Sequence, residues 1–259
     1  MVGEFDRIAD VYDDTRLPLH EEELSILVNA LKTRNCHSLL EIGVGTGRVS
    51  KPLSESSFDM IGIDLSTQMI SRAKQKGLWN LIIADTYFLP FMDDPFDAAI
   101  LVHVVHLLPD PVMALAEIGR VVKNSVMAIV RRPTGFVDEY EQVRRLMRER
   151  VARGGLVDSA ARWRREAELL QSIPPVERKP FCDRTTEMTV DEVVSVLKKR
   201  AYRFTLNISE DELDRIAGEI TSQLKGRTIT RRRTEDIVVW RADQLKALRQ
   251  SPRGLRRSV

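Results

Sequence analysis

The fold is indicated most clearly by the stretch Leu39-Leu40-Glu41-Ile42-Gly43-Val44-Gly45-Thr46-Gly47-Arg48. An apolar run of strand length leads into a glycine-rich turn, and a helical pattern follows the turn. Glycines at such a place let the backbone approach a ligand where a Cβ atom would collide with it. The alternative is a tight strand-to-helix turn that binds nothing. Two acidic residues farther along the chain favour the ligand-binding interpretation.

The spacing of these glycines argues against two nucleotide sites. A dinucleotide-binding turn has the spacing G-x-G-x-x-G and would place a glycine or alanine where this chain has Arg48. A phosphate-binding P-loop would need Gly-Lys-Ser/Thr after four intervening residues, and that sequence is absent. The observed spacing, G-x-G-x-G, therefore disfavours both kinds of site.

Apolar runs and helical patterns alternate around this stretch, which is typical of βαβ units and a parallel sheet. The predicted strands are Ser38–Ile42, Asp59–Ile63, Leu81–Ala84, Ala98–Val102 and Val126–Val130. The predicted helices are Glu21–Lys32, Arg48–Glu55, Thr67–Gln75 and Val112–Val122. Few polar residues interrupt the strands, as expected for strands covered on both faces.

The pattern changes after Gly135, where a charged, helical stretch begins. We predict a core over residues 1–135 and a mainly helical lid that selects the substrate over residues 136–232. Within the lid, Gly154-Gly155 separates two helices, a short strand lies near Val176–Cys182, and two helices span about Thr189–Arg200 and Ser209–Lys225. Residues 233–245 return a last strand, Ile237–Trp240, to the core, and residues 246–259 form a basic tail.

Composition narrows the function classes. The chain has 259 residues, 43% of them hydrophobic, and a formal net charge of +2, so the whole-chain charge does not favour a nucleic acid partner. The cysteines, Cys36 and Cys182, match no metal-ligand spacing, and no metal site is predicted. The N-terminus lacks a signal peptide, and the longest apolar run, Ala98–Leu108, is too short to span a membrane. We expect a cytoplasmic protein, and the sequence predicts no oligomeric state.

Two carboxylates end the second and third predicted strands. Asp64 ends the second strand, across the sheet edge from the glycine turn, where it can accept hydrogen bonds from the two hydroxyls of a ribose. Asp85 follows the third strand and is suited to accept a hydrogen bond from the exocyclic amine of an adenine. Taken singly, Asp64 can also cap the next helix, and Asp85 can form a turn.

Glu41, Gly43, Gly45 and Gly47, with Asp64 and Asp85, resemble the cofactor motifs of the class I S-adenosylmethionine-dependent methyltransferases. The resemblance implies a Rossmann-like, doubly wound, mostly parallel seven-stranded sheet with helices on both faces and a helical lid. It also implies S-adenosyl-L-methionine as cofactor and a small-molecule methyl acceptor. The cofactor site that it implies includes three neighbours of the two acids and two residues of the N-terminal segment: Leu65, Met69, Thr86, Tyr12 and Arg16.

Two further segments are similar to the small-molecule branch that includes the quinone-biosynthesis methyltransferases: Phe5–Asp13, and His106–Pro111 followed by Ala114–Lys123. The resemblance covers roughly the first half of the chain. In that branch an acidic residue usually precedes the first glycine. Ile42 stands there in this chain, so Glu41 is left to fix the loop or bind the amino group of the methionine. The usual Gly-Gly before the fifth strand is Asn124-Ser125.

His103 and His106 follow the fourth strand and are the candidate general bases, with Tyr87 after them. The alternative, which the sequence favours, is that both histidines line the cofactor pocket or bind loop carbonyls. For Tyr12 and Arg16 the alternative is an ordinary helix face. The arginines from Arg144 to Arg165 are more typical of a solvated helix face than of a site for an anionic substrate or RNA.

Other functions stay open at this stage. A nicotinamide-dependent oxidoreductase is disfavoured by Arg48. An RNA or protein methyltransferase is the alternative for the substrate. Enzymes that methylate base amines resemble one another in an Asn/Asp-Pro-Pro-aromatic run after the fourth strand, and this chain reads Val102-His103-Val104-Val105 there. A non-catalytic cofactor-binding protein is the third alternative.

Overall fold

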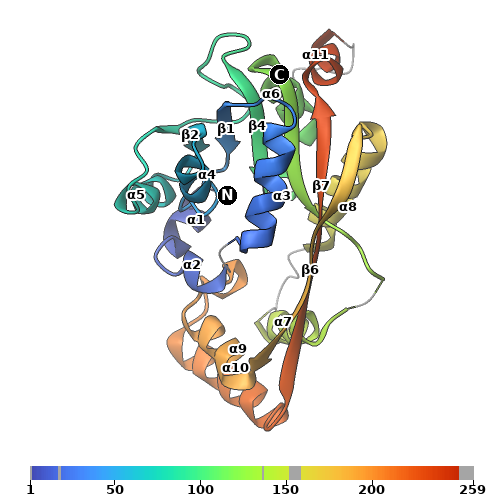
Figure 1. Cartoon of the computed structure of the whole chain (residues 1–259). Helices are drawn as coiled ribbons and strands as arrows, with labels where there is room; N and C mark the ends of the chain where they lie inside the picture. The colour runs from blue at the N-terminus through green and yellow to red at the C-terminus, as the bar shows by residue number, and fades with distance from the viewer. Residues whose placement is uncertain (1, 17–18, 136, 152–158, 251–259) are drawn as a thin grey trace. The chain divides into compact units, whose positions relative to one another are not determined.

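The computed structural model describes residues 2–16, 19–135, 137–151 and 159–250. Its strands form one seven-stranded sheet with the order β3-β2-β1-β4-β5-β7-β6 (Figure 1). The strands are β1 Ser38–Ile42, β2 Asp59–Asp64, β3 Leu81–Ile83, β4 Phe96–Val102, β5 Val122–Arg131, β6 Glu177–Thr189 and β7 Thr228–Arg241. Strands β1 to β5 pair in parallel, and β7 runs antiparallel to β5. The predicted Rossmann-like, mostly parallel seven-stranded sheet is confirmed.

Helices connect the strands of the sheet. They are α1 Val2–Ile8, α2 Tyr12–Thr15, α3 Glu21–Lys32, α4 Ser50–Glu55, α5 Thr67–Gln75, α6 Pro111–Arg120, α7 Glu139–Val151, α8 Ser159–Ser172, α9 Val190–Lys198, α10 Glu210–Gln223 and α11 Ala242–Gln250. Two short 3₁₀ helices are η1 Val105–Leu107 and η2 Arg203–Thr205. Across the described ranges, no helix is both long and apolar enough to cross a membrane.

Capping residues explain where two of the helices begin. The Ser66 hydroxyl accepts the Met69 amide at 3.1 Å at the start of α5, and Asp110 accepts the Met113 amide at 3.0 Å at the start of α6. Side-chain oxygens at this position satisfy amides that have no partner within the helix. These caps fix the start of α5 after β2 and the start of α6 after β4 and η1.

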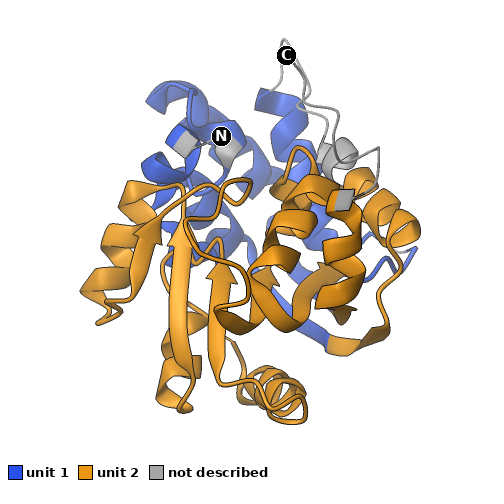
Figure 2. Ribbon diagram, turned by 90° about the horizontal axis from the view of Figure 1, so that it is seen from above, with its two compact units in different colours: residues 1–18, 132–158, 182–234 blue, residues 19–131, 159–181, 235–259 orange. Residues whose placement is uncertain are grey.

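The chain divides into two compact units (Figure 2). Unit 1 comprises residues 1–18, 132–158 and 182–234, and unit 2 comprises residues 19–131, 159–181 and 235–259. Strands β6 and β7 contribute residues to both units. The glycine-rich turn, both acidic strand ends and both candidate histidines belong to unit 2.

The core of unit 2 lies between the sheet and the helices α6, α8 and α11. Leu40 and Ile42 of β1 pack in one cluster with residues of these helices, and because side chains alternate along a strand, Glu41 points to the other face. Trp240 of β7 is fully buried, and its indole N–H donates to the Ile173 carbonyl at 2.8 Å. Helix α6 can lie close to α11 because Gly119 has no side chain. A Cβ atom at this position would come within 2.5 Å of Leu245 Cβ.

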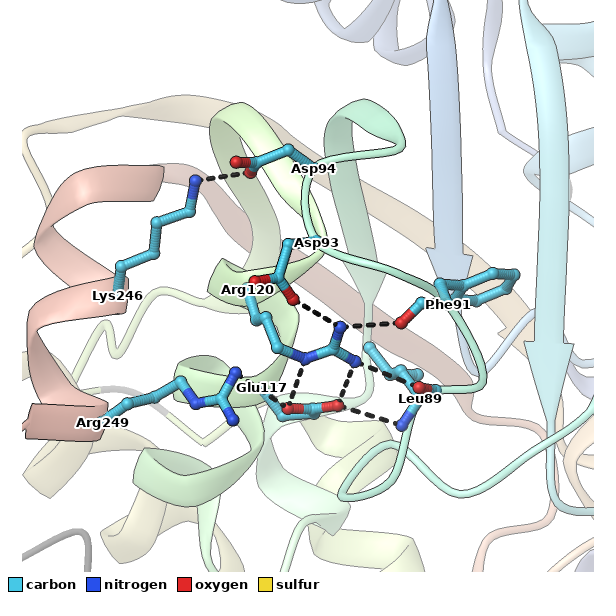
Figure 3. A network of polar contacts seen from close by, with 8 residues as sticks. All are labelled: Leu89, Phe91, Asp93, Asp94, Glu117, Arg120, Lys246 and Arg249. Atoms are coloured by element: carbon cyan, nitrogen blue, oxygen red, sulfur yellow. Dashed lines mark hydrogen bonds and ion pairs between the residues drawn. The ribbon is translucent and has the colours of Figure 1, made fainter.

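A network of polar contacts around Arg120 holds the loop between β3 and β4 (Figure 3). The guanidinium donates to the carbonyls of Phe91 at 2.7 Å and Leu89 at 3.1 Å, and it pairs with Asp93 and Glu117. The hydrogen bonds that Arg120 donates to the carboxylates of Glu117 and Asp93 raise its pKa. The network fixes the segment that follows Asp85.

Unit 1 has a core of its own, formed mainly by α7, α9 and α10. The hydroxyls of Tyr140 and Tyr202 share a hydrogen bond of 2.5 Å within this core. The Arg144 guanidinium lies 5.2 Å from the centre of the Tyr202 ring. The predicted break at Gly154-Gly155 and the basic tail after Gln250 lie outside the described residues.

The last two strands correct the sequence analysis. The strand predicted near Val176–Cys182 runs over Glu177–Thr189, and the strand predicted at Ile237–Trp240 runs over Thr228–Arg241. Their added residues are rich in arginine and threonine and are partly solvated, so no apolar run marks them. Helix α11 was not predicted. The helix predicted over Val112–Val122 ends at Arg120, because β5 already begins at Val122.

Candidate functional site

The glycine-rich turn after β1 has a backbone that favours glycine at three places. Gly43, Gly45 and Gly47 have φ angles of 67°, 56° and 79°, in the left-handed region. A Cβ atom on Gly43 would come within 2.6 Å of Val104 Cγ2, and one on Gly47 within 2.2 Å of Leu78 Cδ1. Beside Gly45 the nearest atom would be 4.0 Å away. Two glycines therefore permit close packing, whereas Gly45 presents open backbone that can contact a ligand.

Asp64, the last residue of β2, holds this turn. Its two carboxylate oxygens accept the backbone amides of Gly45 and Ser66, each at 2.9 Å. A carboxylate oxygen has two lone pairs, so each oxygen can accept a hydroxyl donor as well. The geometry thus places an acceptor of the kind that binds ribose hydroxyls directly beside the open backbone of Gly45.

Asp85 lies after the neighbouring strand. In the parallel pairing of β2 with β3, Ile83 is opposite Asp64, so the two acids extend from adjacent strand ends. Asp85 accepts the Tyr87 amide at 3.0 Å, which shapes the turn after β3. Asp85 therefore forms the turn after β3, and its contact with an adenine stays a prediction.

Glu41 is buried in β1, with 2% of its surface exposed. The Ser50 hydroxyl, at the first residue of α4, donates to Glu41 Oε2. Burial raises the pKa of Glu41 to about 8, although the bond from Ser50 and the charge of Arg48 act in the opposite direction. Glu41 thus ties β1 to the helix beyond the glycine turn, as expected for a residue that fixes the loop. Its contact with a methionine amino group stays a prediction.

The other predicted cofactor residues lie in different surroundings. Leu65 is exposed beside Asp64, Met69 is buried in α5, and Thr86 is buried beside Asp85. Tyr12 and Arg16 belong to unit 1, where the Arg16 guanidinium lies 5.4 Å from the centre of the Tyr12 ring. Cofactor contacts of all five residues stay predictions.

His103 follows β4 and has an unusual backbone. Its φ angle is 58°, a region that residues other than glycine seldom occupy. The ring Nε2 lies 3.3 Å from Oε1 of Glu235, whose side chain is 6% exposed, whereas the side chain of His103 is 32% exposed. A buried carboxylate thus contacts an imidazole that is partly open to solvent.

His106, in η1, has a different environment. Its ring stacks on Trp163 of α8 with centroids 4.4 Å apart, and its Nδ1 lies 3.8 Å from Glu166 Oε2. The third candidate base, Tyr87, accepts the Asp110 amide at 2.9 Å, and burial raises the pKa of its phenol, which disfavours the phenolate form that a base would need.

Sequence reasoning missed three residues near these histidines: Trp163, Glu166 and Glu235. Glu166 accepts the Arg131 amide at 3.2 Å, and burial raises the pKa of Glu166 to about 7. Glu235 is followed by Asp236, which is also buried and pairs with Arg178 at 2.6 Å. The two acids directly before the apolar run Ile237–Trp240 were the available signal in the sequence.

The glycine turn with its two acids and the end of β4 with its histidines lie at the point where the sheet changes winding direction. From β1 the chain continues to β2 and β3 on one side, and β4 and β5 lie on the other. Ile42 of β1 is opposite Leu101 of β4, and the Val104 side chain packs against Gly43. Open α/β sheets bind ligands outside the carboxyl ends of their strands at such a point. The arrangement provides carboxylates and open backbone on one side and a histidine with a buried carboxylate on the other.

Comparison with known proteins identifies the same region. The family described as a methyltransferase domain matches residues 40–130. An uncharacterized methyltransferase from Bacillus subtilis is 30% identical over 46% of this chain and 50% of its own length. A demethylmenaquinone methyltransferase from Renibacterium salmoninarum is 30% identical over 49% of this chain and 55% of its own length. The chain thus spans about half the length of these two relatives.

A solved structure extends the likeness in fold. A methyltransferase from Thermotoga maritima, described as S-adenosylmethionine-dependent and as a possible histamine N-methyltransferase, has a TM-score of 0.54 at 19% identity. The match covers 93% of this chain and 100% of that one. At this identity it supports the fold alone. Residues 40–130 thus match a methyltransferase domain, and the strand order agrees with the Rossmann-like fold of the solved structure.

Proposed function

We propose that this protein transfers a methyl group from S-adenosyl-L-methionine to a small-molecule acceptor. The observation that carries the proposal is the contact between Asp64 and Gly45, which sets the Asp64 carboxylate beside backbone that is open to a ligand. The two carboxylates, Asp64 and Asp85, also fit the cofactor chemically. Asp64 accepts from hydroxyls, Asp85 accepts from an amine, and neither position offers the cationic side chain that a 2′-phosphate would need.

The residues of unit 2 have separate tasks in this reaction. The bound cofactor would supply a methyl group already activated by a cationic sulfur. The glycine turn and Asp64 would fix the position of that group, and the residues around His103 would orient the acceptor in line with it. Alignment is the larger part of such catalysis, with effective molarities that reach ~10⁵ M or more. The lid predicted over residues 136–232 would exclude water and select the acceptor.

A small-molecule acceptor is supported by the relatives rather than by the geometry. Demethylmenaquinone methyltransferase, named for a quinone, is among them. The Asn/Asp-Pro-Pro-aromatic run of the enzymes that methylate base amines is absent after β4, where η1 begins at Val105. We therefore propose a small acceptor and no nucleic acid partner. The cytoplasmic location also stays a prediction.

Calorimetric titration of the purified chain tests the cofactor. We expect S-adenosylhomocysteine to bind with micromolar affinity and NADH to show no binding under the same conditions. Binding of NADH alone would favour the oxidoreductase and overturn the proposal. Binding of neither compound would mean that the glycine turn serves only to join β1 to α4. Asp64→Asn is the matched variant that tests the carboxylate, since it retains the shape of the side chain but removes its charge.

A further inference from the structure

The carboxyl end of β4 holds a histidine and a carboxylate that lie far apart in the sequence. His103 comes directly after β4, and Glu235 lies in the part of β7 that belongs to the same unit. In the antiparallel pairing of β5 with β7, Glu235 is opposite Arg131, the last residue of β5. This register brings Glu235 to the edge where β4 ends, with its Oε1 3.3 Å from His103 Nε2.

We infer that Glu235 positions His103 as the general base for an acceptor that loses a proton on methylation, a hydroxyl or an ammonium group. The inference rests on the proposed function and narrows its acceptor. A thioether acceptor would need no base, so a histidine held by a carboxylate would serve no purpose for it. In many enzymes a third group orients the general base in the same way and keeps it in one tautomer.

The backbone at His103 supports this assignment. A φ angle of 58° is unfavourable for a residue other than glycine, and such conformations persist where the surrounding structure requires them. The next residue, Val104, packs against Gly43, so the turn that carries His103 contacts the glycine turn. The conformation therefore holds the imidazole beside the proposed cofactor site.

The contrast with His106 separates the two candidate bases. The His106 side chain is 14% exposed, stacks on Trp163 and lies 3.8 Å from Glu166, which is longer than a hydrogen bond. Glu166 itself is surrounded by charged groups of several elements, namely Arg131 of β5, Arg178 of β6 and Glu235 of β7. His106 is assigned to the wall of the site, and His103 to proton transfer.

An ammonium acceptor would first give a proton to His103, because a protonated nitrogen has no electron pair with which to attack. The acceptor oxygen or nitrogen would then form its bond to the methyl carbon while the S–CH₃ bond breaks, and the electron pair of that bond would stay on sulfur. The proton of the acceptor passes to His103, and the carboxylate of Glu235 stabilises the resulting imidazolium. The imidazolium then gives its proton to water, so His103 returns to its starting form.

Imidazole ¹⁵N spectra of the full chain test the pairing without any acceptor. The chain has four histidines, and His103→Gln assigns the signal of His103. We expect wild-type His103 to favour one tautomer and Glu235→Gln to give a mixture of both. The control, Glu177→Gln, removes a carboxylate that pairs with Arg34 and should leave the signal unchanged. Equal His103 signals in wild type and Glu235→Gln would overturn the inference.

Methyl transfer to a panel of phenols, alcohols, amines and thioethers tests the acceptor class. We expect Glu235→Gln to lower kcat by about 10–10² at neutral pH, within the contribution of a general base, with KM for the cofactor unchanged and a smaller loss at high pH. Transfer only to thioethers, or to no hydroxyl or amine, would count against the acceptor class. Failure of S-adenosylhomocysteine to bind wild type would instead reject the proposed function.

Discussion

The two sides of the sheet's carboxyl edge are built in opposite ways. On the side of β1, β2 and β3, the site comes from consecutive segments between Glu41 and Asp85, and much of it is backbone: glycine φ angles and the amides that Asp64 accepts. On the side of β4, β5 and β7, it comes from side chains far apart in the sequence, among them His103 and Glu235. A site made by local backbone can be recognised as a motif, whereas a site made by distant side chains requires the fold.

Burial of carboxylates is shared by the two sides. Burial raises the pKa of Glu41 to about 8 on the first side and that of Glu166 to about 7 on the second. Glu41 is held by a local contact with Ser50, and Glu166 by the amide of Arg131, which is distant in the sequence. A comparison of variants on the two sides can therefore determine whether the sides contribute separately to stability and to binding.

The largest effect is expected from pH at Glu41. The folded protein keeps this carboxyl protonated up to about pH 8, whereas the unfolded chain ionises it near its ordinary value of 4.5. The folded state therefore binds more protons in this window, and stability falls as pH rises, by up to ~4–5 kcal/mol between the two values. Glu41→Gln should remove this decline.

Urea unfolding at pH 5, 6.5 and 8 measures the effect. The difference in unfolding free energy between wild type and Glu41→Gln should decrease steadily as pH rises. Glu177→Gln is a control that should show no pH dependence in this window, because bonds to Lys179 and Arg34 lower the pKa of Glu177, and its contribution is lost only as pH falls below the ordinary value of 4.5. Parallel curves for wild type and Glu41→Gln would show that Glu41 ionises freely in the folded protein.

Trp240→Ala should lower the unfolding free energy by ~3–5 kcal/mol, since it removes a fully buried ring and its bond to Ile173. Trp240→Phe, which retains most of the packing, should cost less. At temperatures where the variant is folded, we expect its affinity for S-adenosylhomocysteine to be unchanged. A large loss of affinity would show that the two sides of the edge are coupled, and the comparison would break down.

Asp64→Ala should weaken S-adenosylhomocysteine binding by ~1–3 kcal/mol, because a ribose hydroxyl would lose its acceptor. Calorimetry measures the change, with Asp59→Ala as a control on the same strand, at its exposed first residue. Unchanged affinity for Asp64→Ala would remove Asp64 from the site and leave it as a brace for the glycine turn.

The smallest effect is expected in the network around Arg120 (Figure 3). Lys246→Ala removes a pair with Asp94 whose two side chains are partly exposed, so it should cost only ~0.2–1 kcal/mol. Arg120→Ala should cost more, since Arg120 also binds two backbone carbonyls of the loop after β3. Thermal unfolding of the two variants checks the order, and a reversed order would mean that the network does not hold this loop.

Local signals predicted much of the fold. Strand β1 and helices α3 and α5 begin and end as predicted, because an apolar run, a cap or a glycine marks their ends. The charged extensions of β6 and β7 were missed, since strands with solvated side chains take their structure from pairing with a neighbour rather than from an apolar pattern.

Sequence patterns were enough for the parallel strands β1 to β5, the glycine turn and the two acids, Asp64 and Asp85, because these depend on residues close together in the chain and on backbone angles that glycine permits. Only the tertiary structure separated His103 from His106. The two histidines are three residues apart and look alike in the sequence. Their difference depends on Glu235 and Trp163, which the antiparallel return of β7 and the packing of α8 bring to the end of β4.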